Sequence, residues 1–591
     1  MNKSPNVLQN IGYILKEIWK HKRSLYFNCF IYTVMNGISV FAGLYIPPRI
    51  IDALLNTAAK QQLIVLLILF AVTGFAVAYA RLLFNQAYAM MIQFRFVLCE
   101  YHQRTCLSVP FEQMETLEFE DRVFSAFRCI ANNSSGIEGA MHRLYEWPSY
   151  VTILIISSTA LIKSGLPLFA LACAVGIGKF YIACIAANKK DVCKPEQDTL
   201  ARKVKYYGYM MKDRDMALEL RLPLIQRMLS RRYVSLRRAA LALKCRQTKI
   251  ELDAKLIDAL VDVAKDAIVF VYLILSVLAG RLTIGTLILC INAVESFSAA
   301  IESPLKDYRA IRDDNYSICE FRSFITDTDC REQKGGIQIS QIESIQFEHV
   351  SYSYPNAEKK ALDDVCVSIH RGDHVAIVGE NGAGKTTFIK LLLGLYSPHS
   401  GRILVNGLDL CRIEQKSYYR SLAVLFQDFH ILAFSIAENI ALSETAFDED
   451  SIHRVLDTVH LHQRIDDLTK GIYTPAKKTI EDYGTEFSGG EAQRLALART
   501  LYKKADMVVL DEPSASLDPV EENKLYTLVD SILKDQTVIF VSHRLASTRF
   551  CDNILYFQNG RITENGTHTE LIKNNRGYAA LYNSQSQFYK N

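Results

Sequence analysis

The chain has 591 residues, a length that predicts more than one domain. Half of the residues (50%) are hydrophobic, a share that argues against an ordinary soluble protein. The formal net charge of +4 is small for this length, so the total charge identifies no partner by itself.

The N-terminus carries no pattern of a cleaved signal peptide, and the first long apolar run instead follows the basic residues Lys20, Lys22 and Arg23. Within residues 7–20, apolar side chains recur at roughly helical spacing between basic flanks. We expect an amphipathic helix there that lies on the cytoplasmic membrane surface.

Six apolar stretches follow that approach or exceed the roughly 20 residues needed to span a bilayer. They are Ser24–Ile46, Leu63–Asn85, Trp147–Ser164, Leu166–Ala187, Leu256–Ala279 and Leu282–Ser303. Very short junctions join the third to the fourth and the fifth to the sixth, whereas long segments follow the second and the fourth. The alternative, buried helices of a large soluble protein, fits six such runs in succession poorly.

The distribution of charge predicts the orientation of these helices. The two long segments are rich in Lys and Arg, and each short junction carries a single basic residue. Positive residues favour the cytoplasmic side of a membrane. We therefore predict cytoplasmic N- and C-termini and cytoplasmic long segments, in the plasma membrane of the cell and, for a bacterium, the inner membrane.

Both long segments contain few Gly or Pro residues and repeat apolar positions at helical spacing. We expect the membrane helices to continue through them into the cytoplasm. Two parts are predicted to form the tips of these extensions, one around Glu115–Arg128 and the other around Lys212–Leu222.

The composition becomes polar from about Lys306 to Ile337, and Gly335-Gly336 marks a linker. Beyond it, short β-type runs alternate with helical runs, which is typical of an α/β domain. The candidate strands are Ile345–Tyr354, Val375–Val378, Val508–Leu510 and Val538–Val541. We predict an all-α six-helix transmembrane domain in residues 1–325, a linker in residues 326–342 and an α/β domain in residues 343–591.

The 14 cysteines are scattered, with no Cys-x-x-Cys pair and no Cys/His cluster at the sequence spacing of a metal site. This distribution predicts free thiols in a reducing compartment. Several of these cysteines lie within the predicted membrane helices.

A glycine-rich loop lies between the apolar run His374–Val378 and the helix-compatible run Phe388–Leu393. Its sequence is Gly379-Glu380-Asn381-Gly382-Ala383-Gly384-Lys385-Thr386-Thr387. A strand, such a loop and a helix in this order form a P-loop, in which backbone N–H groups and the helix N-terminus surround phosphates. Lys385 can reach the outer phosphates, and the Thr386 hydroxyl can bind Mg²⁺. The loop therefore predicts a nucleoside triphosphate site.

Another apolar run, Met507–Leu510, ends in two carboxylates, Asp511 and Glu512. Asp511 can orient Mg²⁺ through its water shell, and Glu512 can polarise the attacking water as a general base. A strand that ends in Asp-Glu is common by itself. Downstream of a P-loop, it indicates triphosphate hydrolysis.

The stretch Phe487-Ser488-Gly489-Gly490-Glu491 precedes a helical run from Ala492 to Arg499. Ser-Gly-Gly at a helix N-terminus forms a second phosphate cradle. One γ-phosphate does not need two such cradles from one chain. We therefore expect the residues of this stretch to contact a nucleotide held by another copy.

Together these motifs resemble those of the ATP-binding cassette (ABC) transporters, specifically exporter half-transporters whose membrane domain precedes the cassette. The resemblance covers essentially the whole chain. It implies the type IV exporter fold, with a six-helix transmembrane domain followed by an α/β P-loop ATPase cassette. It also implies an ATP hydrolase coupled to transport, with ATP and Mg²⁺ as cofactors.

The resemblance assigns further roles residue by residue. Tyr354 matches the aromatic residue that stacks on adenine, and Gln427 matches the glutamine that contacts Mg²⁺ and the water. Asp518 lies in the loop that passes between two cassettes, and His543 matches the histidine that contacts the γ-phosphate. Gln427, Glu512 and His543 form the predicted catalytic set. By itself, His543 resembles an ordinary histidine at a strand end.

Two positions depart from the family pattern. Phe487 stands where Leu is commoner, and Glu491 stands where Gln is commoner. Neither change removes a phosphate-binding N–H group or the Ser488 hydroxyl. Because Glu512 and His543 are both present, the chain supplies a complete hydrolysing half-site. This permits a homodimer and leaves open a heterodimer with a degenerate partner.

The resemblance implies two cassettes that close head to tail around two ATP molecules, with Lys385 of one chain and Ser488 and Gly490 of the other on the same nucleotide. ATP binding closes the pair and hydrolysis reopens it, which biases a two-state membrane domain. The predicted partners are a second half-transporter, the lipid bilayer and a small-molecule or peptide substrate, but no nucleic acid. The two tips resemble coupling helices, and the cassette that each one contacts is left open.

Three ionisable residues, Lys179, Asp266 and Glu295, lie at similar depth in the predicted membrane helices. Ionisable groups within a membrane generally have a function or a partner. We expect a structural pair between Lys179 and either Asp266 or Glu295, or contact with cavity water. A role in substrate binding is the alternative.

The substrate class is the least determined feature. Asp482–Glu486 and Phe426–Phe429 resemble variants found in bacterial exporters of peptides and similar natural products, and no cysteine-peptidase domain precedes the membrane helices. We predict export of a peptide-like or other amphipathic small molecule. Lipid flipping, multidrug efflux and a nucleotide-gated channel are the alternatives. A soluble DNA-repair ATPase lacks six spanning stretches, and an importer usually keeps its cassette on a separate chain.

Overall fold

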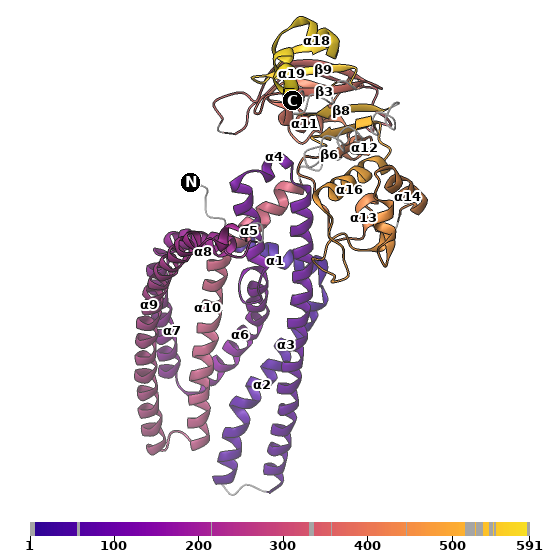
Figure 1. Ribbon diagram of the computed structural model, residues 1–591. Helices are drawn as coiled ribbons and strands as arrows, with labels where there is room; N and C mark the ends of the chain where they lie inside the picture. The colour runs from indigo at the N-terminus through magenta and orange to yellow at the C-terminus, as the bar shows by residue number, and fades with distance from the viewer. Residues whose placement is uncertain are drawn as a thin grey trace. The chain divides into compact units, whose positions relative to one another are not determined.

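The computed structural model describes residues 6–55, 60–213, 216–329, 336–355, 357–444, 446–513, 526–527, 536–542, 548 and 551–587. The chain divides into two compact units. Met1–Ser108 and Leu117–Asp329 form one, which we call the helical unit, and Val109–Thr116 and Cys330–Asn591 form the other, the cassette unit. Figure 1 labels the helices and strands of both.

The helical unit consists of long helices. They are α1 (Val7–His21), α2 (Ser24–Leu55), α3 (Lys60–Ser108), α5 (Leu117–Ile130), α6 (Gly136–Ser164), α7 (Leu166–Asp191), α8 (Lys194–Met210), α9 (Pro223–Leu278) and α10 (Ile284–Asp329). Helix α2 packs on α3, α7 on α9 and α10 on α6 (Figure 1). The predicted membrane stretches lie largely within α2, α3, α6, α7, α9 and α10. As expected, α3, α9 and α10 continue far beyond them, with 49, 56 and 46 residues.

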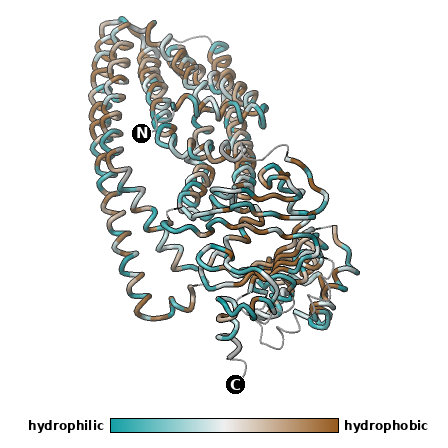
Figure 2. The backbone as a smooth tube through the Cα atoms, turned by 90° about the horizontal axis from the view of Figure 1, so that it is seen from above, coloured by the Kyte–Doolittle hydropathy of each residue, from teal (hydrophilic) through white to brown (hydrophobic). Residues whose placement is uncertain are grey.

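Four helices in the described residues are long and apolar enough to cross a membrane, by length and composition: Ser24–Leu55, Lys60–Ser108, Leu166–Lys190 and Ile284–Thr326. Figure 2 shows hydrophobic residues along much of the long helices. Many of these side chains are exposed, among them Ile64 (54%) and Val65 (62%), which is typical of a surface that faces lipid. The stretches predicted in α6 and α9 do not combine the same length and apolar composition. Helix α9 carries several charged residues within its apolar run.

The N-terminal helix α1 packs differently from the expectation. Its apolar face, with Ile11, Ile14 and Ile18, is buried in the core of the helical unit instead of being left free for the membrane surface. Asn10 is fully buried beside this face and donates a hydrogen bond to Asn315 of α10 at 2.7 Å. Burial of a polar amide requires such a partner, so this bond fixes the position of α1 along α10.

The first predicted tip lies earlier in the chain than expected. Residues of α5, including Phe119, Ala126 and Ile130, pack into the core of the helical unit, so the α5 part of Glu115–Arg128 is no tip. The segment that packs with the cassette unit is Val109–Thr116, which contains the short helix α4 (Phe111–Met114). The second predicted tip falls on turns and on η1 (Glu219–Arg221), with residues 214–215 outside the described residues.

The cassette unit contains two sheets. The first is antiparallel, in the order β2-β1-β4-β5, and the second has the order β10-β9-β3-β8-β7-β6 and is parallel except for β10. The strands are β1 (Ser344–Tyr352), β2 (Leu362–His370), β3 (His374–Gly379), β4 (Ser400–Val405), β5 (Leu408–Asp409), β6 (Leu422–Leu425), β7 (Met507–Asp511), β8 (Thr537–Val541), β9 (Asn553–Gln558) and β10 (Arg561–Gly566). The four predicted strands correspond to β1, β3, β7 and β8.

Two hydrophobic cores lie against the six-stranded sheet, because alternate residues of its central strands enter different cores. Ala376 and Val508 belong to one core, whereas Val375 and Val509 belong to the other. Helix α11 (Lys385–Leu392) packs into the second core. Helices α13 (Ile436–Ala441), α14 (Glu449–Thr458) and α16 (Gly489–Tyr502) pack into the first. Strands buried on both faces explain the short, continuous apolar runs of the sequence.

The other α-helices in the described part of the cassette unit are short: α12 (Gln415–Arg420), α15 (His462–Asp466), α18 (His568–Asn574) and α19 (Gly577–Gln587). The 13 cysteines in the described part of the chain are all free, as the sequence predicts.

Candidate ATP-binding and hydrolysis site

The carboxyl ends of four parallel strands bring the predicted site residues to one edge of the large sheet. In register, β3 pairs with β8 (Ile377 with Val541), β8 pairs with β7, and β7 pairs with β6 (Leu510 with Leu425). The P-loop follows β3, and Asp511 and Glu512 come at the end of β7. Gln427 lies two residues beyond β6. Ligands of open parallel sheets bind at this edge.

The P-loop backbone has a shape that requires glycine. Gly384 has φ +106°, and a Cβ atom there would lie 2.6 Å from the Ala361 carbonyl oxygen. Gly379 is equally restricted, with 2.3 Å to the carbonyl oxygen of Phe557. Glu380, Asn381, Gly382 and Ala383 complete the turn, and α11 begins at Lys385. The loop thus holds its N–H groups close together at a helix N-terminus, which suits an anion.

The Lys385 side chain is buried over this loop, with only 6% of the residue exposed. Its ammonium donates to the carbonyl oxygens of Gly379 at 2.8 Å and Glu380 at 2.9 Å. An ammonium has three N–H donors, so one is left for an anion at the loop. Burial lowers the pKa of Lys385, and the nearby carboxylates Glu512 and Asp511 partly oppose this.

The two threonines at the start of α11 have different surroundings. Thr386 is exposed, which suits the predicted Mg²⁺ ligand. Thr387 is buried, and its hydroxyl lies 3.0 Å from the hydroxyl of Tyr354. This bond places Tyr354 beside the P-loop helix, where its half-buried ring meets Tyr352 and Tyr396 edge to face.

Gln427 and Glu512 contact each other. The Gln427 amide donates to a carboxylate oxygen of Glu512 at 2.8 Å. Glu512 has φ +50°, an uncommon conformation for a residue other than glycine, and its N–H donates to the Val541 carbonyl at 2.9 Å. Strained backbone of this kind is held by its surroundings and is common at functional sites. Here it turns the Glu512 carboxylate toward Gln427 at the sheet edge.

Asp511 is 6% exposed and has a perturbed pKa. Burial raises the pKa of Asp511 to about 6, with a further increase from Glu512 and Asp428 and a decrease from Lys385. A buried carboxylate beside another carboxylate is stabilised by a bound cation. The residues present therefore fit a nucleotide phosphate with Mg²⁺ held by Thr386, Asp511 and Gln427.

The second predicted cradle begins α16. Ser488 is its N-cap and forms a capping box with Glu491. The N–H and hydroxyl groups of Ser488 both donate to the Glu491 carboxylate, at 2.8 and 2.9 Å. Glu491 is one of the two departures from the family pattern. Its carboxylate accepts the hydrogen bond of the Ser488 hydroxyl and adds a negative charge beside Gly489 and Gly490. The charge of Arg464, 3.6 Å away, partly offsets it.

Asp518 and His543 lie outside the described residues, as does the rest of the Ser516–Asp518 loop. Strand β8 ends at Val541, two residues before His543. Their predicted roles in the site remain predictions.

The sequence did not indicate how α4 packs in the cassette unit. Phe111 contacts the core around α11. Glu115 accepts a hydrogen bond from Lys390 at 2.8 Å and another from the Tyr396 hydroxyl. Although burial raises the pKa of Glu115, these two bonds outweigh it and lower the pKa overall. Tyr396 also touches Tyr354, so α4 is one side chain away from the predicted adenine-stacking residue.

Lys179, a buried lysine of the helical unit, has other partners than predicted. Lys179 pairs with Asp262 of α9 at 2.6 Å and with Glu302 of α10 at 2.7 Å, not with Asp266 or Glu295. Asp266 instead contacts Lys265 at 3.3 Å, and Glu295 is exposed. Counting residues from the outer junctions ignores helix tilt and rotation, so it missed the partners by one turn on α9 and two on α10.

Comparisons with known proteins agree with this arrangement. The family model described as "ABC transporter" matches residues 362–515. The subtilin transport ATP-binding protein SpaT of Bacillus subtilis is 28% identical over 589 residues, 96% of this chain and 92% of that protein. An ATP-dependent lipid A-core flippase of Ralstonia nicotianae is 33% identical over 290 residues, and that match spans about half of each chain (48%).

A solved structure shares the fold over nearly the whole chain. It is a bacterial Atm1-family ABC exporter with ATP bound, with a TM-score of 0.79 and 20% sequence identity. The match covers 96% of this chain and 99% of the other.

Proposed function

We propose that this chain is an ABC exporter half-transporter with a fused membrane unit and ATPase cassette, and that two such chains pair to export a peptide-like substrate. The observation that carries the proposal is the bond from Gln427 to Glu512 at the sheet edge that also holds the P-loop. This bond supports Glu512 as the base that would act on a nucleotide in the P-loop.

In this proposal, each side chain has a distinct task. Lys385 and the loop N–H groups bind the ATP phosphates, and Tyr354 stacks on the adenine. Gln427 orients water, and Glu512 accepts its proton as the water attacks. Thr386, Asp511 and Gln427 would hold Mg²⁺, which would supply positive charge against the phosphates when bound. His543 and Asp518 act from the segments beyond β8 and β7.

The two phosphate cradles support a shared site between two chains. The P-loop helix α11 is anchored in one core of the cassette, whereas α16, which begins with Ser488, is anchored in the other core on the opposite face of the sheet. A second chain therefore has to supply Ser488, Gly489 and Gly490 to cover the nucleotide. The termini and the cassette are cytoplasmic in this arrangement.

Mixing two inactive variants tests the shared site. Lys385→Ala disables the P-loop, and Ser488→Arg blocks the cradle, so each variant alone should lose ATP hydrolysis. In a mixed dimer, the intact P-loop of one chain meets the intact cradle of the other. Purified mixed dimers, isolated with two different tags, should trap and hydrolyse ATP in a single turnover at one site. No turnover in mixed dimers would contradict a site shared by two copies.

The charges around Lys179 support a substrate that carries polar or charged groups. Asp262 and Glu302 pair with Lys179 but leave about 40% of their own side chains exposed (40% and 41%). Their free carboxylate oxygens can accept hydrogen bonds from a substrate amine. SpaT, which matches nearly the full chain, is named for the transport of subtilin, whereas the match to the lipid A-core flippase spans half of the chain. A peptide-like substrate is therefore favoured over a lipid.

Conservative substitutions test this substrate site. Asp262→Asn and Glu302→Gln should weaken stimulation of the ATPase by amine-bearing peptides and leave the basal rate unchanged. Glu295→Gln is the matched control, because Glu295 is exposed on the same helix as Glu302. Equal responses of all three variants would contradict the assignment, and stimulation by lipids alone would favour a flippase.

A further inference from the structure

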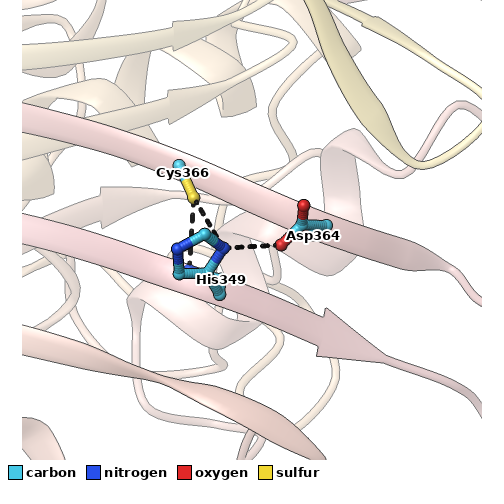
Figure 3. Close-up of side chains that lie close together, drawn as sticks. All are labelled: His349, Asp364 and Cys366. Carbon is cyan, nitrogen blue, oxygen red and sulfur yellow. Dashed lines mark hydrogen bonds and ion pairs between the residues drawn. The ribbon is translucent and has the colours of Figure 1, made fainter.

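Three side chains of different chemistry meet on the exposed face of the antiparallel sheet. His349 comes from β1, and Asp364 and Cys366 come from β2 (Figure 3). All three are exposed. The sequence does not indicate this group, because strand pairing assembles it from positions 15 and 17 residues apart.

The three ligand atoms lie within 4.8 Å of one another. His349 Nδ1 lies 2.8 Å from Asp364 Oδ1 and 3.6 Å from Cys366 Sγ. Figure 3 shows both neighbours on the same ring nitrogen. A Cys-His-Asp catalytic arrangement instead uses the two ring nitrogens separately. One nitrogen cannot fully satisfy two partners, whereas a cation at the centre can bind all three.

The separations fit a tetrahedral metal ion. With metal–nitrogen and metal–sulfur bonds of roughly 2.0–2.3 Å, neighbouring ligand atoms lie about 3.3–3.6 Å apart. The Cys366–His349 separation of 3.6 Å already has this value, whereas the Asp364–His349 separation of 2.8 Å would have to lengthen. The side chains of His349 (77% exposed) and Asp364 (61% exposed) have room for this change.

The backbone holds the group in place. The register of β1 against β2 shifts between Phe347 and Val350, and this bulge contains His349. His349 and Asp364 both adopt positive φ, +49° and +55°. Bulges redirect side chains and often lie at functional positions. Here the bulge brings the imidazole over the neighbouring strand.

Neighbouring charges are already paired elsewhere. Arg561 and Lys360 bind Asp363, and Arg402 binds Glu348 at 2.6 Å. Of these cations, Arg561 also interacts with Asp364 through its charge, but the hydrogen bond of the Asp364 carboxylate is to His349. The backbone N–H of His349 also donates a hydrogen bond to Cys366 Sγ at 3.3 Å. Such a bond stabilises a thiolate.

We propose that His349, Asp364 and Cys366 bind a divalent transition-metal ion, with Zn²⁺ as the best match and water as the fourth ligand. Nitrogen, sulfur and one carboxylate oxygen suit Zn²⁺, whereas Mg²⁺ and Ca²⁺ require mainly oxygen ligands. Cys366 binds as the thiolate, and its proton passes to the solvent. The ion links β1 to β2 at the bulge and is distinct from the Mg²⁺ of the ATP site.

Alkylation of Cys366 tests the site directly. The full-length protein in detergent, reduced, chelator-treated and freed of any histidine tag, is treated with iodoacetamide with and without Zn²⁺, and each cysteine is followed by mass spectrometry. Zn²⁺ should slow alkylation of Cys366 by more than about tenfold, since the metal holds the thiolate. Cys411, also exposed, is the internal control and should not respond. An unchanged rate at Cys366 overturns the proposal.

Variants then identify the ligands. His349→Ala should abolish the protection of Cys366, and Cys366→Ser should weaken Zn²⁺ binding in calorimetry by more than about 100-fold, because even outer partners of a metal site contribute 10–100-fold. Cys411→Ser should bind Zn²⁺ as the unmodified chain does. A second group, His453, His462 and Asp466, is a possible competitor, so His462→Ala is included. Binding lost in His462→Ala but kept in His349→Ala overturns the assignment.

Discussion

Glu512 shows how a single backbone conformation prepares the proposed chemistry. Its left-handed φ of +50° and its N–H bond to Val541 hold the carboxylate beside the Gln427 amide. Leu425 of β6 pairs with Leu510 of β7, so Gln427 and Glu512, each two residues further along, reach the same height at the sheet edge. The position of the proposed base therefore follows from strand pairing.

Replacing Glu512 by Gln tests its role as the base. Glu512→Gln keeps the size and the contact with Gln427, so ATP binding should be retained. The hydrolysis rate should fall by about 10²–10⁴-fold, the usual contribution of general-base catalysis. ATP binding and steady-state phosphate release measure the two effects, with Glu414→Gln as a control remote from the sheet edge. Substantial turnover in Glu512→Gln would mean that another group is the base.

The raised pKa of Asp511 leads us to expect that magnesium binding depends on pH. Since burial raises its pKa to about 6, Asp511 binds a proton below that pH and must release it to face Mg²⁺. The affinity for Mg·ATP should therefore be constant above about pH 6 and weaken below it, by up to about tenfold per pH unit for one proton. Calorimetry with Mg·ATP between pH 5 and 7.5 measures this.

Asp511→Asn is the control for this profile, because protonation of the nucleotide itself is common to both proteins. The difference between the two profiles isolates the Asp511 carboxyl. If the unmodified protein and Asp511→Asn lose affinity in parallel, Asp511 does not face the metal.

Glu491 places a negative charge at the second phosphate cradle. We therefore expect this cradle to bind a phosphate more weakly than one with Gln at this position. Glu491→Gln keeps the capping box with Ser488, since either residue suits this position, and removes a negative charge beside the partner's phosphate. The apparent affinity for ATP should increase by about two- to fivefold, the range for one exposed charge interaction. ATP titrations of hydrolysis measure it. Glu486→Gln, just ahead of the cap, should have no effect, and a weaker affinity in Glu491→Gln would contradict the argument.

At the scale of elements, α4 packs within the cassette unit, although it lies in sequence between two helices of the helical unit. Its contacts are the apolar side chain of Phe111 and the carboxylate of Glu115, bound by Lys390 and Tyr396. Glu115 is 41% exposed, so its bond with Lys390 should contribute only about 1 kcal/mol.

Hydrogen exchange tests this packing. In the full chain, Glu115→Gln should speed amide exchange in Val109–Thr116 by about fivefold, which corresponds to roughly 1 kcal/mol. The charge reversal Glu115→Lys should have a larger effect, and adding Lys390→Glu should restore slow exchange. Exchange that is unchanged in both single variants would show that Phe111 alone holds α4.

The sequence predicts which residues form an element better than it predicts which elements pack together. The P-loop, the Asp-Glu strand end and the cradle at Ser488 are contiguous motifs with a local physical reason, so their elements were predicted correctly. The strands β2, β4, β5, β6, β9 and β10 were missed, because strand formation depends on pairing and packing with neighbouring strands. The location of the first tip was wrong because α5 buries its apolar face in the helical unit.

Contacts between distant segments are what the sequence could not provide. The partners of Lys179 depend on the rotation of α9 and α10, and a one-turn error exchanges Asp262 for Asp266. The group of His349, Asp364 and Cys366 depends on a bulge in β1. Neither feature leaves a pattern along the chain.

For the whole molecule, we propose that ATP hydrolysis in the cassettes drives uphill movement of a substrate through the helical units. The fused order of the two units gives each chain a cassette and a set of apolar helices. In the proposed dimer, two chains would provide the two half-sites and the substrate path. A channel on the same fold would use the nucleotide only to open.

Vectorial uptake tests this claim most directly. Inside-out vesicles that contain the unmodified protein or Glu512→Gln are supplied with Mg·ATP and a panel of labelled peptides, lipids and drugs. We predict that the unmodified protein accumulates a peptide-like compound above its outside concentration and that Glu512→Gln does not. Movement of that compound only down its gradient, at equal rates in both proteins, would contradict the account.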